Sequence, residues 1–400
     1  MKFLFKKGTF ATLSKAYDLF NEERISKIQV RGKRGIPSVS FNILFDGSSS
    51  DKKFQKLTLT AETASALNEN VKFDLNDNYH HFLNMLVNSD KNGIEIEFDT
   101  NDSGNCLVVS SEGIKSSFTT TKKDDEQNDV IVAPILSFTK KKFEEHFNSF
   151  KGLSDPLKWV DNKIAGINII TTLTNGYLYL GTQAFYSVKN IDSSCFFREA
   201  SGGFNYNPGV VLVTDEILNF ISESLVNDDS TVLFRITQPV SGQTTVSYGI
   251  EIGNLSLYVI CFAREKAYEI MNTIVSPFIE SKNENKVSIS LKWLNKFFSV
   301  FDRSSVFMTE AVSFNVSNKI LSIVPVENSD SAKLFEVSLA LNEAKNDTKI
   351  ELNFYVLSKL LKKLEGEEVE FIEKKDNPNR ILLTDGKTNF VVGKLKKQKQ

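Results

Sequence analysis

The side chains that could carry out chemistry are few in this sequence and do not form a recognisable site. The three histidines, His80, His81 and His146, have no second histidine or cysteine at the spacing of a zinc ligand set. The sequence also lacks a GxxxxGK[ST] phosphate loop, a GxGxxG turn and a GxSxG nucleophile elbow. The acidic run at 122–126 lacks the spacing of a calcium-binding loop and is typical of a solvated linker. We therefore expect no catalytic residue, no metal and no cofactor, and a non-enzymatic function.

Lysine is the side chain that recurs at regular positions. In the segment 289–304, apolar residues recur at helical spacing, while Lys292 and Lys296 fall on another face of the same helix. The lysines on such polar faces are Lys7, Lys15, Lys140, Lys141, Lys151, Lys292, Lys296, Lys359, Lys362 and Lys363. Lysines often only keep a helix face in water. That interpretation is weaker in a chain of formal net charge −2 that places its cations on equivalent helices.

One order of elements occurs three times along the chain: a basic helix, a pair of strands, a second helix and another strand pair. The first helices are expected at 5–20, 138–153 and 289–304, and the second helices at 79–87, 214–226 and 353–364. Polar stretches at 119–129 and 281–286 are typical of linkers. The predicted domains are therefore 1–128, 130–281 and 286–400, each long enough to fold around its own core.

Between the helices the pattern changes to short alternating runs, which are typical of antiparallel strands. These runs lie at 38–45, 57–60, 93–98, 107–110, 164–172, 177–180, 231–237, 256–263, 312–316, 320–326, 369–373, 381–384 and 389–392. Turn residues at 174–177 and 385–387 predict hairpins, and 48–53 predicts a hairpin tip. The predicted fold class is α+β, with three tandem similar domains, each of two helices packed on antiparallel sheets.

The helix expected at 214–226 is an exception, because it carries no lysine. Asp215 and Glu216 follow Thr214, a suitable N-cap residue, and acidic side chains suit the first turn of a helix. We interpret these acids as structural and expect any basic surface to be thinnest there.

The composition is that of a globular chain, with 41% apolar and 24% charged residues. The three cysteines, Cys106, Cys195 and Cys261, lie far apart and are odd in number, which argues against a disulfide framework. Lys6 and Lys7 interrupt the apolar N-terminus, so it lacks a secretory signal. No apolar run reaches the length of about 18 residues that a membrane span needs. We expect a cytoplasmic protein with no membrane partner.

The order of elements resembles that of the bacterial sliding clamp, the beta subunit of DNA polymerase III. The segment 350–371 is similar to the closing part of a clamp, and 164–167 with 177–188 is similar to the strands that line its client pocket. Residues 1–3 and 57–64 resemble the first clamp domain. Each similarity is weak, but together they follow the order of the family.

The resemblance implies a ring formed by head-to-tail pairing of two chains around double-stranded DNA. The helices would line the hole, and their lysines would face phosphates without reading the sequence of the bases. The implied partners are duplex DNA, a DNA polymerase and other proteins with a clamp-binding motif, a clamp loader and a second copy of the chain.

The resemblance also implies a groove for client peptides between the second and third domains. By position it would use Ile164, Thr182, Ala184, Phe185, Tyr186, Tyr268, Met271, Val391, Gly393 and Leu395. Two stretches depart from the family. The usual Thr-Asp-Gly-His-Arg-Leu is replaced at 182–187, and the usual Met-Pro-Met-Arg-Leu ending is replaced at 393–397. These departures suggest a divergent replication system, such as that of a phage or plasmid, with a different client motif.

Ring closure would bring Phe118 and Thr120 of one chain against residues near 303–307 of the other, among them Arg303, Val306 and Phe307. Phe118 can equally be an ordinary core residue. Three alternatives to a sliding clamp stay open. The first is a ring clamp of another arrangement, or a polymerase accessory that no longer encircles DNA. The second is a multidomain β-rich interaction or structural protein without a DNA role, and the least favoured is a hydrolase.

Overall fold

The computed structural model describes residues 2–6, 8–21, 23–46, 52–91, 97–100, 106–111, 114–122, 135–153, 166–172, 175–181, 185–197, 209–236, 245–262, 265–282, 284–301, 311–325, 337–341 and 348–394. Within these residues the strands form three sheets, and every strand pair is antiparallel. Together with the helices this gives an α+β fold, as the sequence predicts.

The largest sheet runs through the first part of the chain and into the middle. Its strand order is β1-β6-β7-β8-β5-β2-β3-β4-β16-β15-β14-β9. The bounds are β1 Lys2–Leu4, β2 Ile25–Gly32, β3 Ser38–Phe45, β4 Lys52–Glu62, β5 Val71–Leu75, β6 Glu97–Thr100, β7 Cys106–Ser111, β8 Ile114–Lys122, β9 Leu136–Thr139, β14 Thr231–Ile236, β15 Thr245–Ile252 and β16 Leu255–Phe262.

Two further sheets complete the strand architecture. One has the order β13-β10-β11-β12-β24-β23-β22-β17, and the other has the order β20-β19-β18-β21. Their bounds are β10 Gly166–Thr171, β11 Gly176–Gly181, β12 Phe185–Asn190, β13 Gly209–Thr214, β17 Glu284–Ser290, β18 Ala311–Ser317, β19 Ile320–Pro325, β20 Val337–Ala340, β21 Thr348–Asn353, β22 Glu368–Lys374, β23 Arg380–Thr384 and β24 Asn389–Gly393.

Two strand pairs join the parts of the chain that the sequence assigns to different domains. Strand β4 pairs with β16, with Leu57 opposite Leu257, and β12 pairs with β24, with Tyr186 opposite Val391. Backbone hydrogen bonds therefore run continuously from the first predicted domain to the second and from the second to the third. The domain limits themselves stay a prediction, because the first linker lies largely outside the described residues.

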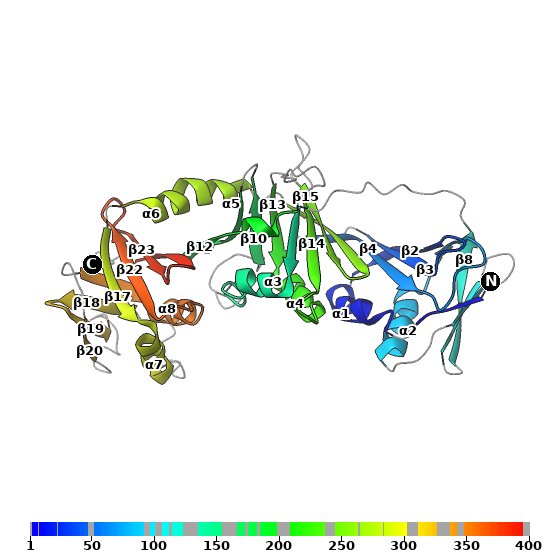
Figure 1. Ribbon diagram of the computed structural model, residues 1–400, viewed down its shortest axis with the longest axis horizontal. Helices are drawn as coiled ribbons and strands as arrows, with labels where there is room; N and C mark the ends of the chain where they lie inside the picture. The colour runs from blue at the N-terminus through cyan, green and yellow to red at the C-terminus, as the bar shows by residue number, and fades with distance from the viewer. Residues whose placement is uncertain are drawn as a thin grey trace.

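The helices divide between two sides of the molecule. They are α1 Ala11–Phe20, α2 Tyr79–Lys91, α3 Lys140–Phe147, α4 Asp215–Ser224, α5 Glu265–Ile270, the π-helix η2 Met271–Val275, α6 Ser276–Glu280, α7 Leu291–Phe301 and α8 Phe354–Leu361, with a short 3₁₀ turn η1 at Ser193–Cys195. Helices α1, α2, α3, α4, α7 and α8 lie along one long side of the row of sheets, and α5 and α6 lie on the other (Figure 1).

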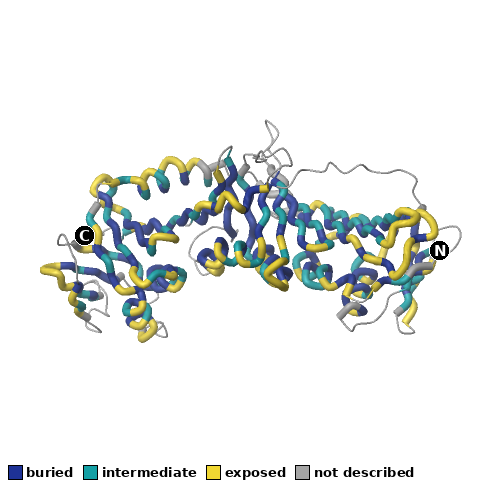
Figure 2. The backbone as a smooth tube through the Cα atoms, in the orientation of Figure 1, coloured by how far each residue is buried: buried dark blue, intermediate teal, exposed yellow. Residues whose placement is uncertain are grey.

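Phenylalanine, of which the sequence has 32, fills much of the interior. In the first part of the chain, the ring centroid of Phe5 lies 5.2 Å from that of Phe10 and 4.9 Å from that of Phe98. The buried sides of the helices face the strands, and their exposed sides face away (Figure 2). The apolar stripes seen in the sequence therefore do mark the packed faces of the helices.

Three predicted helices begin later than expected, and in two of them a strand occupies the first residues. The helix expected from residue 5 begins at Ala11, after β1 and a turn in which Gly8 has a φ of 77°. The other two begin after β9 and β17. Part of the linker expected at 281–286 is also a strand, since Glu284 opens β17 and lies opposite Lys374. The hairpin predicted at 385–387 is confirmed: Asp385 Oδ1 accepts hydrogen bonds from the backbone N–H groups of Lys387 and Thr388.

Candidate nucleic-acid interface and client-binding face

Six of the lysines predicted to face DNA lie in helices that share one side of the molecule (Figure 1): Lys15, Lys140, Lys141, Lys292, Lys296 and Lys359. Lys151 follows α3, and Lys362 and Lys363 follow α8. Lys141, Lys151, Lys292, Lys296 and Lys362 are exposed. Lys15, Lys140, Lys359 and Lys363 are half-buried, and Lys7 lies outside the described residues. The described lysines of this set are thus open to solvent, at least in part, on the helix side of the sheets.

Helices α7 and α8 show how the sequence separates a packed face from a basic one. Leu291, Leu294 and Phe298 are buried, whereas Lys292 and Lys296 of the same helix are exposed. In α8 the side chain of Asn353 caps the first turn by accepting a 3.0 Å hydrogen bond from the backbone N–H of Val356. The cap fixes where α8 begins and so which residues face outward.

Lysines from two predicted domains are close enough for their charges to interact. Burial lowers the pKa of Lys363 on the α8 side, and the positive charges of Lys151 and Lys359 lower it further. Lys151 follows α3 in the second domain, and Lys359 lies in α8 with its Nζ 5.2 Å from the ring centroid of Tyr355. Mutual repulsion of this kind means that an anion placed between the three lysines would be attracted by all of them.

Helix α4, which has no lysine, is flanked by lysines from its neighbours. Lys15 of α1 donates a 2.7 Å hydrogen bond to the carbonyl oxygen of Glu223, and Lys140 of α3 donates one of 3.4 Å to that of Val226. Both acceptors are at the C-terminal end of α4, where the helix dipole favours cations. Thr214 is the N-cap residue, as predicted, but its hydroxyl donates to Glu216 Oε2 at 3.0 Å and does not cap the backbone.

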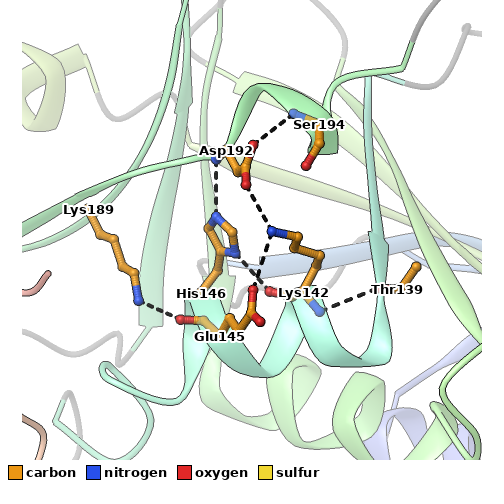
Figure 3. A network of polar contacts seen from close by, with 7 residues as sticks. All are labelled: Thr139, Lys142, Glu145, His146, Lys189, Asp192 and Ser194. Atoms are coloured by element: carbon orange, nitrogen blue, oxygen red, sulfur yellow. Dashed lines mark hydrogen bonds and ion pairs between the residues drawn. The ribbon is translucent and has the colours of Figure 1, made fainter. Parts of the chain in front are cut away.

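A polar network fixes α3, the helix that carries Lys140 and Lys141 (Figure 3). Thr139 caps its first turn by accepting a 3.4 Å hydrogen bond from the backbone N–H of Lys142. Lys142 turns away from the basic face, because its Nζ lies 2.9 Å from Asp192 Oδ2 and 3.4 Å from Glu145 Oε2. Lys189 of β12 donates a hydrogen bond to the carbonyl oxygen of Glu145. Helix α3 is thus anchored to η1 and β12.

His146 lies at the centre of this network and has a structural role. Its Nδ1 donates a 2.8 Å hydrogen bond to the carbonyl oxygen of Lys142, and its Nε2 accepts one of 3.1 Å from the backbone N–H of Asp192. This pair of contacts fits only the neutral ring. Burial lowers the pKa of His146, and the nearby Lys189 and Lys142 lower it further, against the hydrogen bond to Lys142. Hydrogen bonds from Lys142 and Ser194 hold the pKa of Asp192 well below its ordinary value.

Two other findings concern groups that could do chemistry. Burial raises the pKa of the Cys195 thiol to about 11, which keeps it protonated. Among the residues the structure describes, no group of three or more His, Cys, Asp and Glu side chains is placed to hold a metal ion. No helix in the same part of the chain is long and apolar enough to cross a membrane.

Three residues of the expected client groove meet on one face of the sheet in which β12 pairs with β24. Tyr186, Met271 and Val391 pack in or against one apolar cluster, and the guanidinium of Arg380 lies 5.7 Å from the ring centroid of Tyr186. Met271 and Val391 are both closed off from solvent, at 1% and 0% exposure. The face is therefore covered in this structure.

The other expected groove residues lie elsewhere or cannot be placed. Phe185 points to the opposite face of the same sheet, where its ring centroid lies 6.1 Å from that of Phe390 in the main core. Gly393 is exposed at the end of β24. The remaining members fall outside the described residues, or, for Tyr268, have a side chain that is not described: Ile164, Thr182, Ala184, Tyr268 and Leu395.

The residues expected at the dimer interface are only partly described. Phe118 is buried, with its ring centroid 5.3 Å from that of Phe82, and Thr120 is buried beside it on β8. The side chain of Phe118 therefore packs within the first domain, as the alternative interpretation holds. Arg303, Val306 and Phe307 lie outside the described residues.

The helical segment 265–280, which forms α5, η2 and α6, was not predicted from the sequence. The sequence does contain a pattern that predicts this helix, because the apolar residues Ala267, Met271, Ile274 and Phe278 follow helical spacing. The repeat pattern of two helices per domain left no place for a further one. This segment supplies Met271 to the covered face and so decides whether a groove is open.

Comparisons with known proteins identify the fold. No protein-family model matches the sequence, and no curated protein matches it. Solved structures match along the whole chain, and they define the DNA-clamp fold. The DNA polymerase III subunit beta of Pseudomonas aeruginosa matches with a TM-score of 0.65 at 14% identity, covering 99% of this chain and 100% of that one. The beta subunit from the DNA polymerase of Streptococcus pyogenes matches with a TM-score of 0.66 at 13% identity, covering 99% and 100%.

A third match is the DNA polymerase III subunit beta of Borrelia burgdorferi, solved in complex with a natural product. Its TM-score is 0.62 at 12% identity, and all of both chains is covered. The chain therefore has the fold of the bacterial DNA polymerase III beta subunits along its whole length, at low sequence identity. The resemblance seen in the order of elements is confirmed for the fold. The suggested phage or plasmid origin gains no support.

Proposed function

We propose that this chain is a DNA sliding clamp, in which two copies close into a ring around duplex DNA and tether a polymerase and other clients. The observation that carries the proposal is the match of the fold along the whole chain to DNA polymerase III beta subunits, together with the position of α1, α3, α7 and α8, which carry lysines, on one side of the sheets (Figure 1). Such a surface suits backbone phosphates, which lie along the duplex whatever its sequence.

The charge of the chain supports sliding rather than tight binding. The formal net charge is −2, so the lysines of the helix side stand out against a nearly neutral molecule. A ring holds DNA by topology, and its lining has only to be mildly attractive. Lys15 and Lys140 are engaged by the end of α4, which leaves the lining weakest in the second domain.

Ring closure is supported by features at the two ends of the molecule (Figure 1). Residues 114–119 of β8 pair with β7 on one side, whereas β5 pairs only with 120–122 on the other. That leaves part of a strand edge without a partner among the described strands. Ile114, at the start of this edge, is 67% exposed, and Val300 in α7 at the other end is 70% exposed. A head-to-tail dimer would cover both.

The test is retention on closed DNA. The chain is brought from dilute solution to micromolar concentration in the presence of a nicked circular plasmid, and the plasmid is then separated by gel filtration. We expect the protein to elute with the circle and to be lost when the same plasmid is linearised. Equal retention on both forms, or none on the circle, would contradict encirclement.

The lining is tested in the same assay with charge reversal of Lys292, Lys296, Lys359 and Lys363. We expect weaker loading or retention, because the reversed side chains repel phosphate. Unchanged retention, together with unchanged processivity of a tethered polymerase, would rule out these helices as the DNA-facing surface.

A further inference from the structure

The segment 265–280, named here the connector helix, runs between the second and third domains on the side opposite the basic helices (Figure 1). It follows β16 and precedes β17, and it consists of α5, the π-helix η2 and α6. It therefore spans the junction at which β12 pairs with β24.

The connector helix buries one stripe of side chains. Met271, Val275 and Phe278, at helical spacing, are buried, whereas Glu269, Asn272, Thr273, Pro277 and Glu280 are exposed. The stripe packs on residues from both sides of the junction: Ile170, Tyr179 and Val188 of the second domain, and Ile372, Leu382 and Val391 of the third. This cluster is distinct from the main core, which lies on the other face of the sheet.

The hydrogen bonds that hold the connector helix to β22 and the turn after it lie at the C-terminal end of the helix. Lys374 of β22 is almost fully buried, and its Nζ donates hydrogen bonds to the carbonyl oxygens of Ile279 and Ser281. Ser281 also donates a 3.4 Å hydrogen bond to Asp376. These are the carbonyl groups that a helix end leaves without internal partners. A side chain from the third domain thus closes the end of the connector helix.

The middle of the connector helix is irregular. Residues Met271–Val275 form a π-helix, a geometry that is rare and costs helical regularity. Thr273 donates a 2.7 Å hydrogen bond back to the carbonyl oxygen of Glu269, and Pro277 has no N–H to donate. The two domains do not depend on this helix for their union, because β12 and β24 are joined by their own backbone hydrogen bonds.

We propose that the connector helix is a releasable cover of the client-binding face, and that a client reaches this face by displacing it. The partner is then an apolar, partly aromatic peptide that replaces Met271, Val275 and Phe278 over the β12–β24 junction. The identity of this partner as a clamp client rests on the proposed function. The observations that this face is covered and that it lies apart from the main core do not depend on the proposed function.

The decisive experiment uses the full chain and a fluorescein-labelled peptide with the sequence of residues 265–280. Met271→Asp weakens the grip of the connector helix and leaves the sheet face intact, so the free peptide should bind this variant at least ten times more tightly than the unmodified chain. Asn272→Asp is the matched control, since it adds the same charge on the exposed side of the same turn. Lys374→Met, which removes the hydrogen bonds at the helix end, should also raise the affinity. Equal affinity of all four proteins would overturn the proposal.

Hydrogen exchange on the unmodified chain tests the proposal without any variant. We expect the backbone amides of 270–280 to exchange at least ten times faster than those of β12 and β24, since the helix opens while the sheet stays paired. Exchange of both at one common rate would mean that the helix leaves only on global unfolding, and would also overturn the proposal. Failure of the proposed function looks different, because the unmodified chain would then not be retained on circular DNA whatever the peptide does.

Discussion

Lys15 in α1 donates a 2.7 Å hydrogen bond to the carbonyl oxygen of Glu223, 208 residues further along the chain in the last turn of α4. This contact joins the first and second predicted domains on the helix side of the molecule. It also explains how a helix without lysines can lie among basic ones, because its C-terminal end accepts cations from both neighbours, Lys15 and Lys140.

Replacing Lys15 should weaken this junction slightly. Lys15→Met removes a charged hydrogen bond at a helix C-terminus, so the free energy of unfolding should fall by about 0.5–1 kcal/mol. Urea denaturation at low salt measures the change. Lys33→Met is the control, because Lys33 is exposed in the β2–β3 turn. Equal losses of unfolding free energy in the two variants would show that the contact of Lys15 with Glu223 does not stabilise the chain.

The lysines at the junction of the second and third domains should account for part of the salt dependence of DNA binding. Each lysine that neutralises a phosphate adds about 0.9 to the slope of log K against log salt concentration on duplex DNA. Lys359→Gln/Lys363→Gln should therefore reduce the slope by roughly 1.8. Titrations of a short linear duplex at several salt concentrations measure it.

The double variant Lys282→Gln/Lys375→Gln is matched in charge and serves as the control. Both lysines are exposed near the C-terminal end of α6, on the opposite side from the basic helices. We expect this variant to keep the slope of the unmodified chain. A loss of slope equal to that of the first pair would indicate a general effect of net charge and would contradict a local site.

His146 should make the stability of the chain fall in mildly acidic solution. Its pKa is lowered in the folded chain, so between that pKa and the ordinary value near 6.5 the unfolded chain binds the extra proton. Stability from this group is therefore complete above about pH 6.5 and is lost as the pH falls through the lowered pKa. Thermal unfolding between pH 8 and pH 5 measures the decline.

His146→Gln offers a sharp control for this pH effect. The amide can donate to the carbonyl of Lys142 and accept from the N–H of Asp192, as the neutral ring does, but it does not titrate. The variant should lose less stability between pH 7 and pH 5 than the unmodified chain, whereas His81→Gln, at an exposed position, should not change the decline. The same decline in His146→Gln would assign the effect to other groups.

The helix faces could be read from the sequence because they depend on local spacing. Leu291, Leu294 and Phe298 mark the packed side of α7 as expected, and Thr214 is the N-cap residue of α4. The starts of α3 and α7 could not be predicted, because apolar residues such as Phe138 and Ile289 suit a strand as well as a helix. These two residues are in strands because Phe138 pairs with β14 and Ile289 pairs with β22.

The candidate sites are formed by contacts between segments that are far apart in the sequence. Such contacts are harder to predict from the sequence than helix faces are. Phe185 and Tyr186 are neighbours in β12 and must point to opposite faces, so only one of them can belong to the covered face. Which one it is depends on the connector helix, which was not predicted. The electrostatic effect of Lys151 on Lys363 likewise joins residues that are far apart in the sequence.

Asp74 should contribute strongly to the stability of the first domain. Its carboxylate is buried and lies 2.6 Å from both Lys27 Nζ and Arg31 Nη2. Burial raises its pKa, but the hydrogen bonds and charges of Lys27 and Arg31 outweigh burial and leave the pKa below its ordinary value. Asp74→Ala leaves two cations without their partner and should lower the free energy of unfolding by about 2 kcal/mol.

Urea denaturation tests this expectation against Glu62→Ala, which removes the exposed ion pair with Lys6 and should have little effect. The pH dependence gives a second check. Because the pKa of Asp74 is lowered, its contribution is present above the ordinary value near 3.9 and is lost as the pH falls below it. Similar losses for the two variants would show that burial of the carboxylate does not matter.

Ile114 should matter for the assembly of the ring and little for the fold of the chain. It is exposed at the free edge of β8, where a charge costs nothing in the single chain but would be buried against a partner. Ile114→Glu should therefore raise the dissociation constant of the proposed dimer at least tenfold. Val300→Glu, at the other end of the molecule, should act in the same direction. Sedimentation equilibrium over a range of protein concentrations measures both constants.

The control for ring assembly is Ile36→Glu, because Ile36 is also exposed in the first domain but lies in the turn between β2 and β3. In a head-to-tail dimer, one copy offers the Ile114 edge and the other offers the Val300 end, so each substitution weakens both interfaces of a closed two-chain ring. The Ile36 variant should dimerise like the unmodified chain. If all three variants keep the same dissociation constant, or the unmodified chain is monomeric at micromolar concentration, the β8 edge is not the closing surface.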